Sequence, residues 1–177
     1  MKILSALLIS VAITGAAIAA TKDAEKADAA MPVMHMDKAT FVKTVGGANT
    51  FEIESSKLAV QKATSADVKE FAQKMIDDHT KAGEELTAIL TKEGGTPPPR
   101  ALAPKQADAM KLLTAAKGAD FEAAYITLQT RAHMEAVALF RTYAGKPDDK
   151  DVGEFASKTL PSLEMHLAHV KMLVGAH

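Results

Sequence analysis

The sequence predicts an all-α fold, a ferritin-like antiparallel four-helix bundle with a short extra helix in the connection between its second and third long helices. Hydrophobic residues make up 47% of the chain but aromatic residues only 5%, and the abundant Ala, Leu, Lys, Glu and Met favour helices over strands. Apolar residues recur three and four positions apart along four long segments, which is the spacing of one helix face. No segment alternates as a strand does, so we expect no sheet.

The first residues have the pattern of a cleavable leader. Lys2 gives a positive start, an apolar run follows, and Ala17-Ile18-Ala19 provides the small-x-small pattern that signal peptidases cleave. Residues 1–19 are therefore predicted to be a signal peptide, and the protein is expected in the periplasm or outside the cell, with no membrane span after cleavage. A membrane anchor is the alternative, and it is disfavoured because the run is short for a bilayer.

Residues 20–36 are small, charged and aperiodic, and predict a flexible linker. The bundle domain is expected over residues 37–175. Asp37, and then Thr64 or Ser65, are predicted to cap the first two long helices, and Gly94-Gly95 to end the second. The predicted helices, in chain order, cover residues 38–62, 66–93, 104–116, 119–144 and 148–174.

Proline and glycine modify this pattern at three places. The run Pro97–Pro99 cannot be helical and predicts a stiff crossing between two helical hairpins. Pro161 falls inside the last helix, where we expect an interruption with a kink near residues 158–160. Gly46-Gly47 lies inside the first helix and would let another helix come close.

Charge and composition exclude several classes of function. The chain of 177 residues carries 21 Lys and Arg against 22 Asp and Glu, so it has no basic field for nucleic acid. It has no Cys, which excludes disulfides, thiolate chemistry, zinc ribbons and iron–sulfur clusters. We therefore expect no nucleic acid partner, whereas a metal ion and a second copy of the chain remain open as partners.

One ionisable residue on each long helix lies on the predicted inward face or at its margin. These residues are Glu52, His79, His133 and His166. A buried ionisable group needs a partner, and carboxylates and imidazoles are ligands for transition metals, which bundle cores assemble from facing helices. The sequence therefore predicts a metal site, for zinc, iron, manganese or copper, and no catalytic residue.

The same residues also fit a bundle that binds no metal. A single inward histidine is often a hydrogen-bonded core residue, and His79 could pair with Glu52 across the first hairpin. His133 lies at the margin of its face, near Glu122 and Gln129, where solvation is equally compatible with the pattern. Gly83, four residues after His79, leaves room there for a ligand or a neighbouring ring.

Comparison with di-metal bundles gives a negative result. Those proteins use Glu-x-x-His on two helices, whereas Ile76 precedes His79 and Leu163 precedes His166 by three residues. Two bridging carboxylates are therefore missing, and a di-iron oxidoreductase is disfavoured. Asp77 and Asp78 lie off the inward face and are expected to be solvated.

A second set of residues combines thioethers with imidazoles, the ligands that suit Cu(I). In the linker the set contains Met31, Met34, His35 and Met36, and on one side of the last helix it contains Met165, His169 and Met172. The alternative is that these methionines fill the core, as methionine often does.

Three segments point to a family. The first is Phe71–His79 (FAQKMIDDH), within a longer match that begins at Phe41. The other two are AYITLQTRAHMEAVALFRTYA and TLPSLEMHLAHVKML. Together they resemble DUF4142, a bacterial family of domains of unknown function. The resemblance covers residues 37–174. It implies a ferritin-like fold and export, with no established activity, and places Glu52, His79, His133 and His166 at motif positions. Members are often labelled outer membrane proteins, for which this sequence gives no support.

One departure from the family is Ser55-Ser56, where Leu-Gly is expected; it bears on the packing of the first hairpin. Taken together, the pattern favours an exported, non-enzymatic module that binds a metal or small ligand in envelope or stress homeostasis. Two alternatives remain: a purely structural or protein-interaction bundle, and an oxidoreductase with a degenerate di-metal centre.

Overall fold

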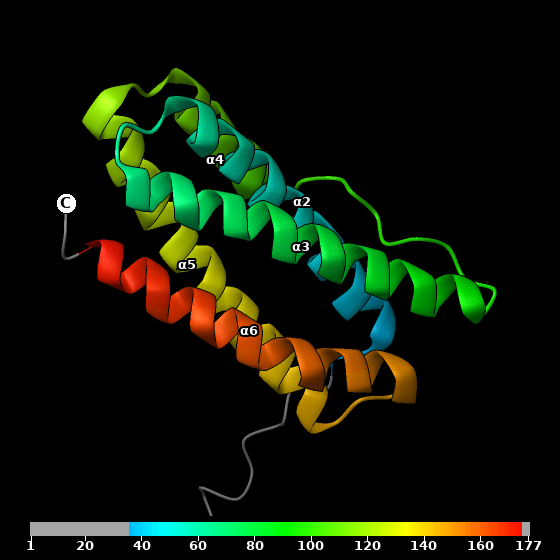
Figure 1. Ribbon diagram of the computed structural model, residues 1–177. Coiled ribbons are helices and arrows are strands. Elements are labelled where there is room, and N and C mark those ends of the chain that lie inside the picture. Colours follow the sequence, from blue (N-terminus) through cyan, green and yellow to red (C-terminus); the bar gives the residue numbers. More distant parts are fainter. Residues whose placement is uncertain (1–35, 175–177) are drawn as a thin grey trace, which may run out of the picture. The chain divides into compact units, whose positions relative to one another are not determined.

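The computed structural model describes residues 36–174 (Figure 1). This part of the chain contains five helices and no strand. Their bounds are α2 Lys38–Lys62, α3 Ala66–Lys92, α4 Pro104–Ala115, α5 Gly118–Gly145 and α6 Lys150–Val174. Each lies within two residues of its predicted bounds, so the all-α prediction is confirmed, whereas the ferritin-like classification stays a prediction.

The four long helices form two antiparallel hairpins that pack against each other (Figure 1). Helices α2 and α3 form the first hairpin, and α5 and α6 form the second. Between the hairpins, α2 packs on α5 and α3 packs on α6, while the short α4 contacts both α2 and α5. Each long helix therefore has two long neighbours and one face directed into the bundle.

The hydrophobic core of the bundle is divided into two clusters. One cluster includes Phe71 and Met75 of α3 together with Tyr125 of α5. The other includes Leu86 of α3 and Phe140 of α5. Between these clusters, the buried positions of the long helices carry polar side chains, namely Glu52, Ser55, Ser56, His79, Gln129, His133 and His166. A buried polar layer thus separates two apolar halves.

Local signals in the sequence account for where the helices begin. Asp37 caps α2 by accepting a 2.8 Å hydrogen bond from the Thr40 backbone N–H, and Ser65 caps α3. The turn between these helices has a further partner from α5, because the buried carboxylate of Glu122 accepts hydrogen bonds from the backbone N–H groups of Thr64 and Ser65. The cap at the start of α3 is therefore partly supplied by the second hairpin.

The segment that approaches α2 at Gly46 and Gly47 is the proline-rich connection, not another helix. A Cβ on Gly47 would lie 2.7 Å from the Ala101 carbonyl oxygen, and one on Gly46 would meet the Pro99 carbonyl oxygen still more closely. The prediction that these glycines admit another helix was wrong, since it is the extended backbone of residues 98–101 that approaches. This connection ends at α4, whose last carbonyls accept hydrogen bonds from Lys62.

Two other expectations about the helices need correction. Helix α6 runs through Pro161 without interruption, and it packs on both α5 and α3. His133 of α5, which the sequence placed at the margin of its helix face, is fully buried, and its neighbours Glu122 and Gln129 are buried with it. The sequence had left a solvated position for His133 open, and the structure excludes it.

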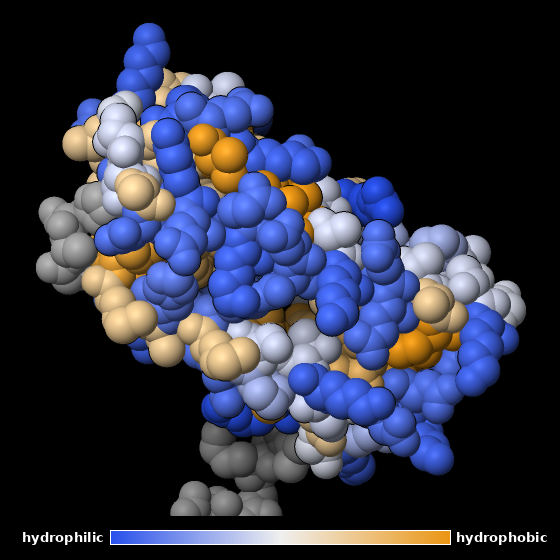
Figure 2. All heavy atoms as spheres, viewed as in Figure 1, coloured by the Kyte–Doolittle hydropathy of each residue, from blue (hydrophilic) through white to orange (hydrophobic). Residues whose placement is uncertain are grey.

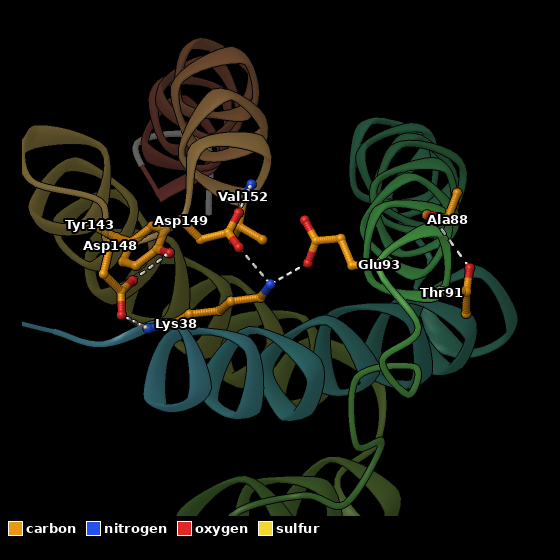
Figure 3. Close-up of polar contacts among 8 residues, drawn as sticks. All are labelled: Lys38, Ala88, Thr91, Glu93, Tyr143, Asp148, Asp149 and Val152. Carbon is orange, nitrogen blue, oxygen red and sulfur yellow. Dashed lines mark hydrogen bonds and ion pairs between the residues drawn. The ribbon is translucent and has the colours of Figure 1, made fainter.

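Lys38 ties three elements together at one end of the bundle (Figure 3). Its ammonium pairs with Glu93, which follows α3, and with Asp149, which precedes α6, at 2.6 Å from Asp149 Oδ2. Its backbone N–H donates to Asp148, which also accepts from the Tyr143 hydroxyl. Hydrogen bonds to Asp149 and Glu93 raise the pKa of Lys38, so the ammonium stays charged.

None of the described helices combines the length and hydropathy needed to cross a membrane. The predicted leader and nearly all of the predicted linker lie outside the described residues.

Replacing Lys38 by Met should lower the free energy of unfolding by about 1 kcal/mol, because the variant loses a part-buried cation shared by two carboxylates. Urea unfolding at neutral pH measures this. Lys105→Met is the matched control, since Lys105 also joins two helices through an ion pair with Glu135 but is 60% exposed. Equal losses in both variants would show that the Lys38 cluster contributes no more than a surface pair.

Candidate metal centre

Three histidines from three helices meet in the polar layer. His79 of α3, His133 of α5 and His166 of α6 each offer a ring nitrogen, and these nitrogens all lie within 4.8 Å of one another. The ring centroids are 5.5–5.7 Å apart. The side chains are at most 7% exposed. The structure therefore brings together three of the four residues that the sequence singled out.

The outer nitrogen of each ring is held by an oxygen atom. The Nδ1 of His79 lies 3.0 Å from Asn49 Oδ1, the Nδ1 of His133 lies 3.0 Å from the Gln129 carbonyl oxygen, and the Nε2 of His166 lies 2.8 Å from Asp78 Oδ2. Amide, carbonyl and carboxylate oxygens accept hydrogen bonds, so each histidine donates an N–H to its partner. These contacts fix both the orientation and the tautomer of each ring.

The inner nitrogens carry lone pairs as a consequence. They are His79 Nε2, His133 Nε2 and His166 Nδ1, all buried and without a hydrogen-bond partner among the described residues. In a neutral imidazole the nitrogen opposite the N–H is an acceptor. Within residues 36–174, three acceptors thus converge with no donor between them.

Burial keeps these imidazoles neutral at ordinary pH. It lowers the pKa of His133 to about 4, and it lowers the pKa of His79 well below its usual value, with His133 and His166 adding to the effect. Burial also lowers the pKa of His166, against the opposing effect of the Asp78 carboxylate. Neutral imidazole is the form that binds metal ions.

Glu52 lies beside the histidines but on a different side of His133. Its Oε1 is 3.8 Å from His133 Nδ1, the nitrogen that already donates to Gln129, and it does not belong to the group of mutually close ligand atoms. Burial raises the pKa of Glu52 to about 8, with Gln129 partly opposing the shift. The alternative in which His79 pairs with Glu52 is not realised, because His79 Nδ1 contacts Asn49 instead.

A polar network that includes Ser55 and Ser56 surrounds Glu52. The Gln129 amide donates to Ser55 at 2.9 Å, and Ser56 and Tyr125 share a hydrogen bond of 2.8 Å. Both serines are fully buried. Ser55-Ser56 therefore extends the polar layer from the histidines toward Tyr125.

The space beside Gly83 is filled by a side chain of the first hairpin. A Cβ on Gly83 would lie 2.7 Å from Asn49 Nδ2, so the glycine admits the amide that orients His79, not a ligand or a ring. This function was missed because Asn49 and Gly83 are 34 positions apart and no local pattern connects them. Asp78 was missed for a related reason: its position off the inward face of α3 faces α6, and it reaches His166 there.

A groove connects the site with the surface. It has a volume of about 860 Å³, and its lining includes His79 and His166 together with Asn49, Glu52 and Asp78. Lys81, Arg100 and Lys158 also line it. The groove thus reaches two of the three histidines, whose inner nitrogens are themselves buried.

The donor set fits a single ion that accepts nitrogen ligands. Three imidazoles suit zinc, copper, iron or nickel, while manganese favours oxygen-rich sites. The two positions that hold bridging carboxylates in di-metal bundles are occupied by Ile76 and Leu163, and the structure brings no replacement into the group.

Comparison with known protein families shows to which family the chain belongs. The model of DUF4142, a domain of unknown function, matches residues 23–173. The chain belongs to the DUF4142 family. No curated protein matches it.

Two solved structures share the fold of this DUF4142 domain. One is described as CopM in the Cu(II)-bound form, with a TM-score of 0.68 and 16% sequence identity, covering 79% of this chain and 97% of that one. The other is a DUF305 fragment from Deinococcus radiodurans, with a TM-score of 0.68 and 16% identity, covering 78% and 95% of the two chains. At this identity the likeness concerns the fold alone.

The buried groups of the DUF4142 domain should give metal-free protein a two-sided pH dependence. Below about pH 6.5, the ordinary pKa of His, the unfolded chain binds protons that the folded histidines do not, so the free energy of unfolding should fall as the pH drops toward about 4. Glu52 acts in the opposite direction: folded, it keeps its proton up to about pH 8, so stability should fall as the pH rises toward that value.

Urea unfolding in the presence of a chelator, repeated from pH 4 to pH 8.5, measures both effects. Glu52→Gln should abolish the decline between pH 6.5 and 8 and should also steepen the loss of stability on the acid side, because the opposing contribution of Glu52 begins near its ordinary pKa of 4.5. An unaltered decline in this variant would mean that Glu52 ionises freely in the folded protein.

Proposed function

We propose that this DUF4142 domain is a transition-metal-binding module in which His79, His133 and His166 bind one ion. The observation that carries the proposal is the convergence of three buried imidazole lone pairs, each fixed by a hydrogen bond on the far side of its ring. Metal-ligating histidines typically have such an outer partner.

A purely structural role for the histidines explains these contacts less well. Histidines that stabilise a core do so with both nitrogens satisfied, whereas a buried acceptor without a partner costs about 1–3 kcal/mol. Three such acceptors lie together here, between two apolar clusters. A bound cation would satisfy all of them at once and offset this cost.

Copper is the ion that we propose, with zinc as the closest competitor. Imidazole suits both ions, and copper(II) binds nitrogen sites more tightly than the other divalent first-row ions. The fold likeness to CopM, described in a Cu(II)-bound form, supports copper over zinc. Glu52, which the sequence placed in the metal site, lies on the Nδ1 side of His133 and outside the group of close ligand atoms, so we propose the three histidines alone as the protein ligands.

A binding role, not an enzymatic one, suits this set of residues. In this proposal the ion takes up the lone pair of each inner nitrogen, so none of the three imidazoles is left to act as a general base. The leader-like first 19 residues favour export. We therefore propose that the module holds a metal ion in the cell envelope and contributes to its metal or stress homeostasis.

Adding Cu(II) to metal-free protein should raise the melting temperature, because an ion that binds only the folded state stabilises it by about 2.7 kcal/mol at a concentration 100 times Kd. Zn(II) should do the same to a smaller extent, and Mg(II) should have no effect. Differential scanning fluorimetry after chelator treatment gives the comparison.

The variant His133→Gln should abolish this gain, because it removes a donor at the centre of the group. His169→Gln is the matched control, since His169 lies on α6 outside the group of three and should keep the gain from Zn(II). If the His133 variant binds Cu(II) and Zn(II) as tightly as the natural chain does, the three-histidine site is refuted.

Asn49→Ala should weaken metal binding about 10- to 100-fold, the usual effect of removing the partner that orients a ligand histidine. Asn49→Asp keeps an acceptor oxygen for His79 Nδ1 and should retain most of the affinity. Competition titration with a metal chelator compares the two variants. Equal losses in both would indicate that Asn49 acts by packing and not by orienting the imidazole.

A further inference from the structure

Two methionines of α6 are exposed to solvent, although methionine is an apolar residue. Met165 is 59% exposed and Met172 is 68% exposed, whereas Met75 of α3 is fully buried. The explanation that these methionines fill the core was therefore wrong. Figure 2 shows moderately hydrophobic side chains at the surface along α6, among hydrophilic ones. Thioethers in this position remain accessible for another interaction.

The exposed methionines flank a histidine on one side of the helix. Met165, His169 and Met172 follow one another at spacings of four and three residues, so they lie on the same helix face. Seven residues span about 10.5 Å along a helix, and methionine has an unbranched side chain with three rotatable bonds. Both sulfur atoms can thus turn toward the imidazole between them.

The imidazole of His169 is positioned by an aromatic contact. Its ring packs edge-on against Phe71 of α3, with centroids 5.1 Å apart, which restricts the side chain. No hydrogen bond to either ring nitrogen is found within residues 36–174. The ring is held by an apolar contact and keeps a nitrogen available as a ligand.

We propose that Met165, His169 and Met172 form a surface site for Cu(I). Two thioethers and an imidazole are soft or borderline ligands, and they select Cu(I) over hard cations and over ions that prefer nitrogen or oxygen alone. This site is separate from the three buried histidines, which offer nitrogen only. It does not depend on whether those histidines bind an ion.

Methyl NMR of the full chain tests the proposal directly. Protein labelled with ¹³C at the methionine methyl groups is titrated with Cu(I) under anaerobic conditions, and the signals are assigned with Met165→Leu and Met172→Leu. Both methyl signals should shift together and stop shifting at one equivalent. Leucine preserves the apolar character and the helix propensity at these exposed positions, so the variants should fold.

Three further variants test whether Cu(I) binding is specific to Met165, His169 and Met172. Met134→Leu is the matched control, because Met134 is 55% exposed on α5 but outside the set, and it should leave the titration unchanged. Met165→Leu/Met172→Leu should lose one equivalent of bound Cu(I) in competition with a chromogenic Cu(I) chelator. His133→Gln should leave the two methyl shifts intact, which separates this site from the buried one.

The proposal fails if neither methyl signal moves. It also fails if the shifts occur only at Met31, Met34 or Met36, or equally at Met134, because copper would then bind elsewhere or without selectivity. Shifts that follow protein concentration and not copper would instead indicate that this face associates with a second copy of the chain, and would equally overturn the copper site.

Discussion

The structure depends on a buried layer of imidazoles that must remain neutral and correctly oriented. This layer divides the core, so the two apolar clusters pack against it as well as within themselves. The outer hydrogen bonds of His79, His133 and His166 reach Asn49 of α2, Gln129 of α5 and Asp78 of α3. Every long helix therefore contributes to holding the layer, and the register between the hairpins is set by polar contacts as much as by apolar packing.

The sequence was sufficient to predict the helices, because their ends carry local signals. Asp37 and Ser65 are capping residues. Gly94 follows α3 with a φ of +78°, a backbone conformation that glycine adopts without steric strain. It was also sufficient to predict which histidines face inward on α3 and α6, where each follows apolar neighbours at helical spacing. Each of these signals depends on residues a few positions apart, so it can be recognised in the sequence without knowledge of the packed structure.

What could not be predicted involves partners distant in the chain. The inward face of α5 contains Glu122, Gln129 and His133, and a rule that places polar residues outside rotates that helix incorrectly. Glu122 is paired with the α2–α3 turn, Gln129 donates to Ser55, and His133 donates to the Gln129 carbonyl of its own helix. Such partners offset part of the cost of burying these polar groups. The same holds for Asn49 and Asp78, whose relation to the histidines exists only once the hairpins are packed.

The capping of the α2–α3 turn by Glu122 has a consequence for how the chain reaches this structure. The carboxylate that pairs with the Thr64 and Ser65 backbone belongs to α5, so the first hairpin in isolation leaves the beginning of α3 incompletely capped. Its turn is completed only when the second hairpin docks. Two hairpins linked in this way are expected to fold and unfold as one cooperative unit, with no stable half-folded species in which the N-terminal hairpin stands alone.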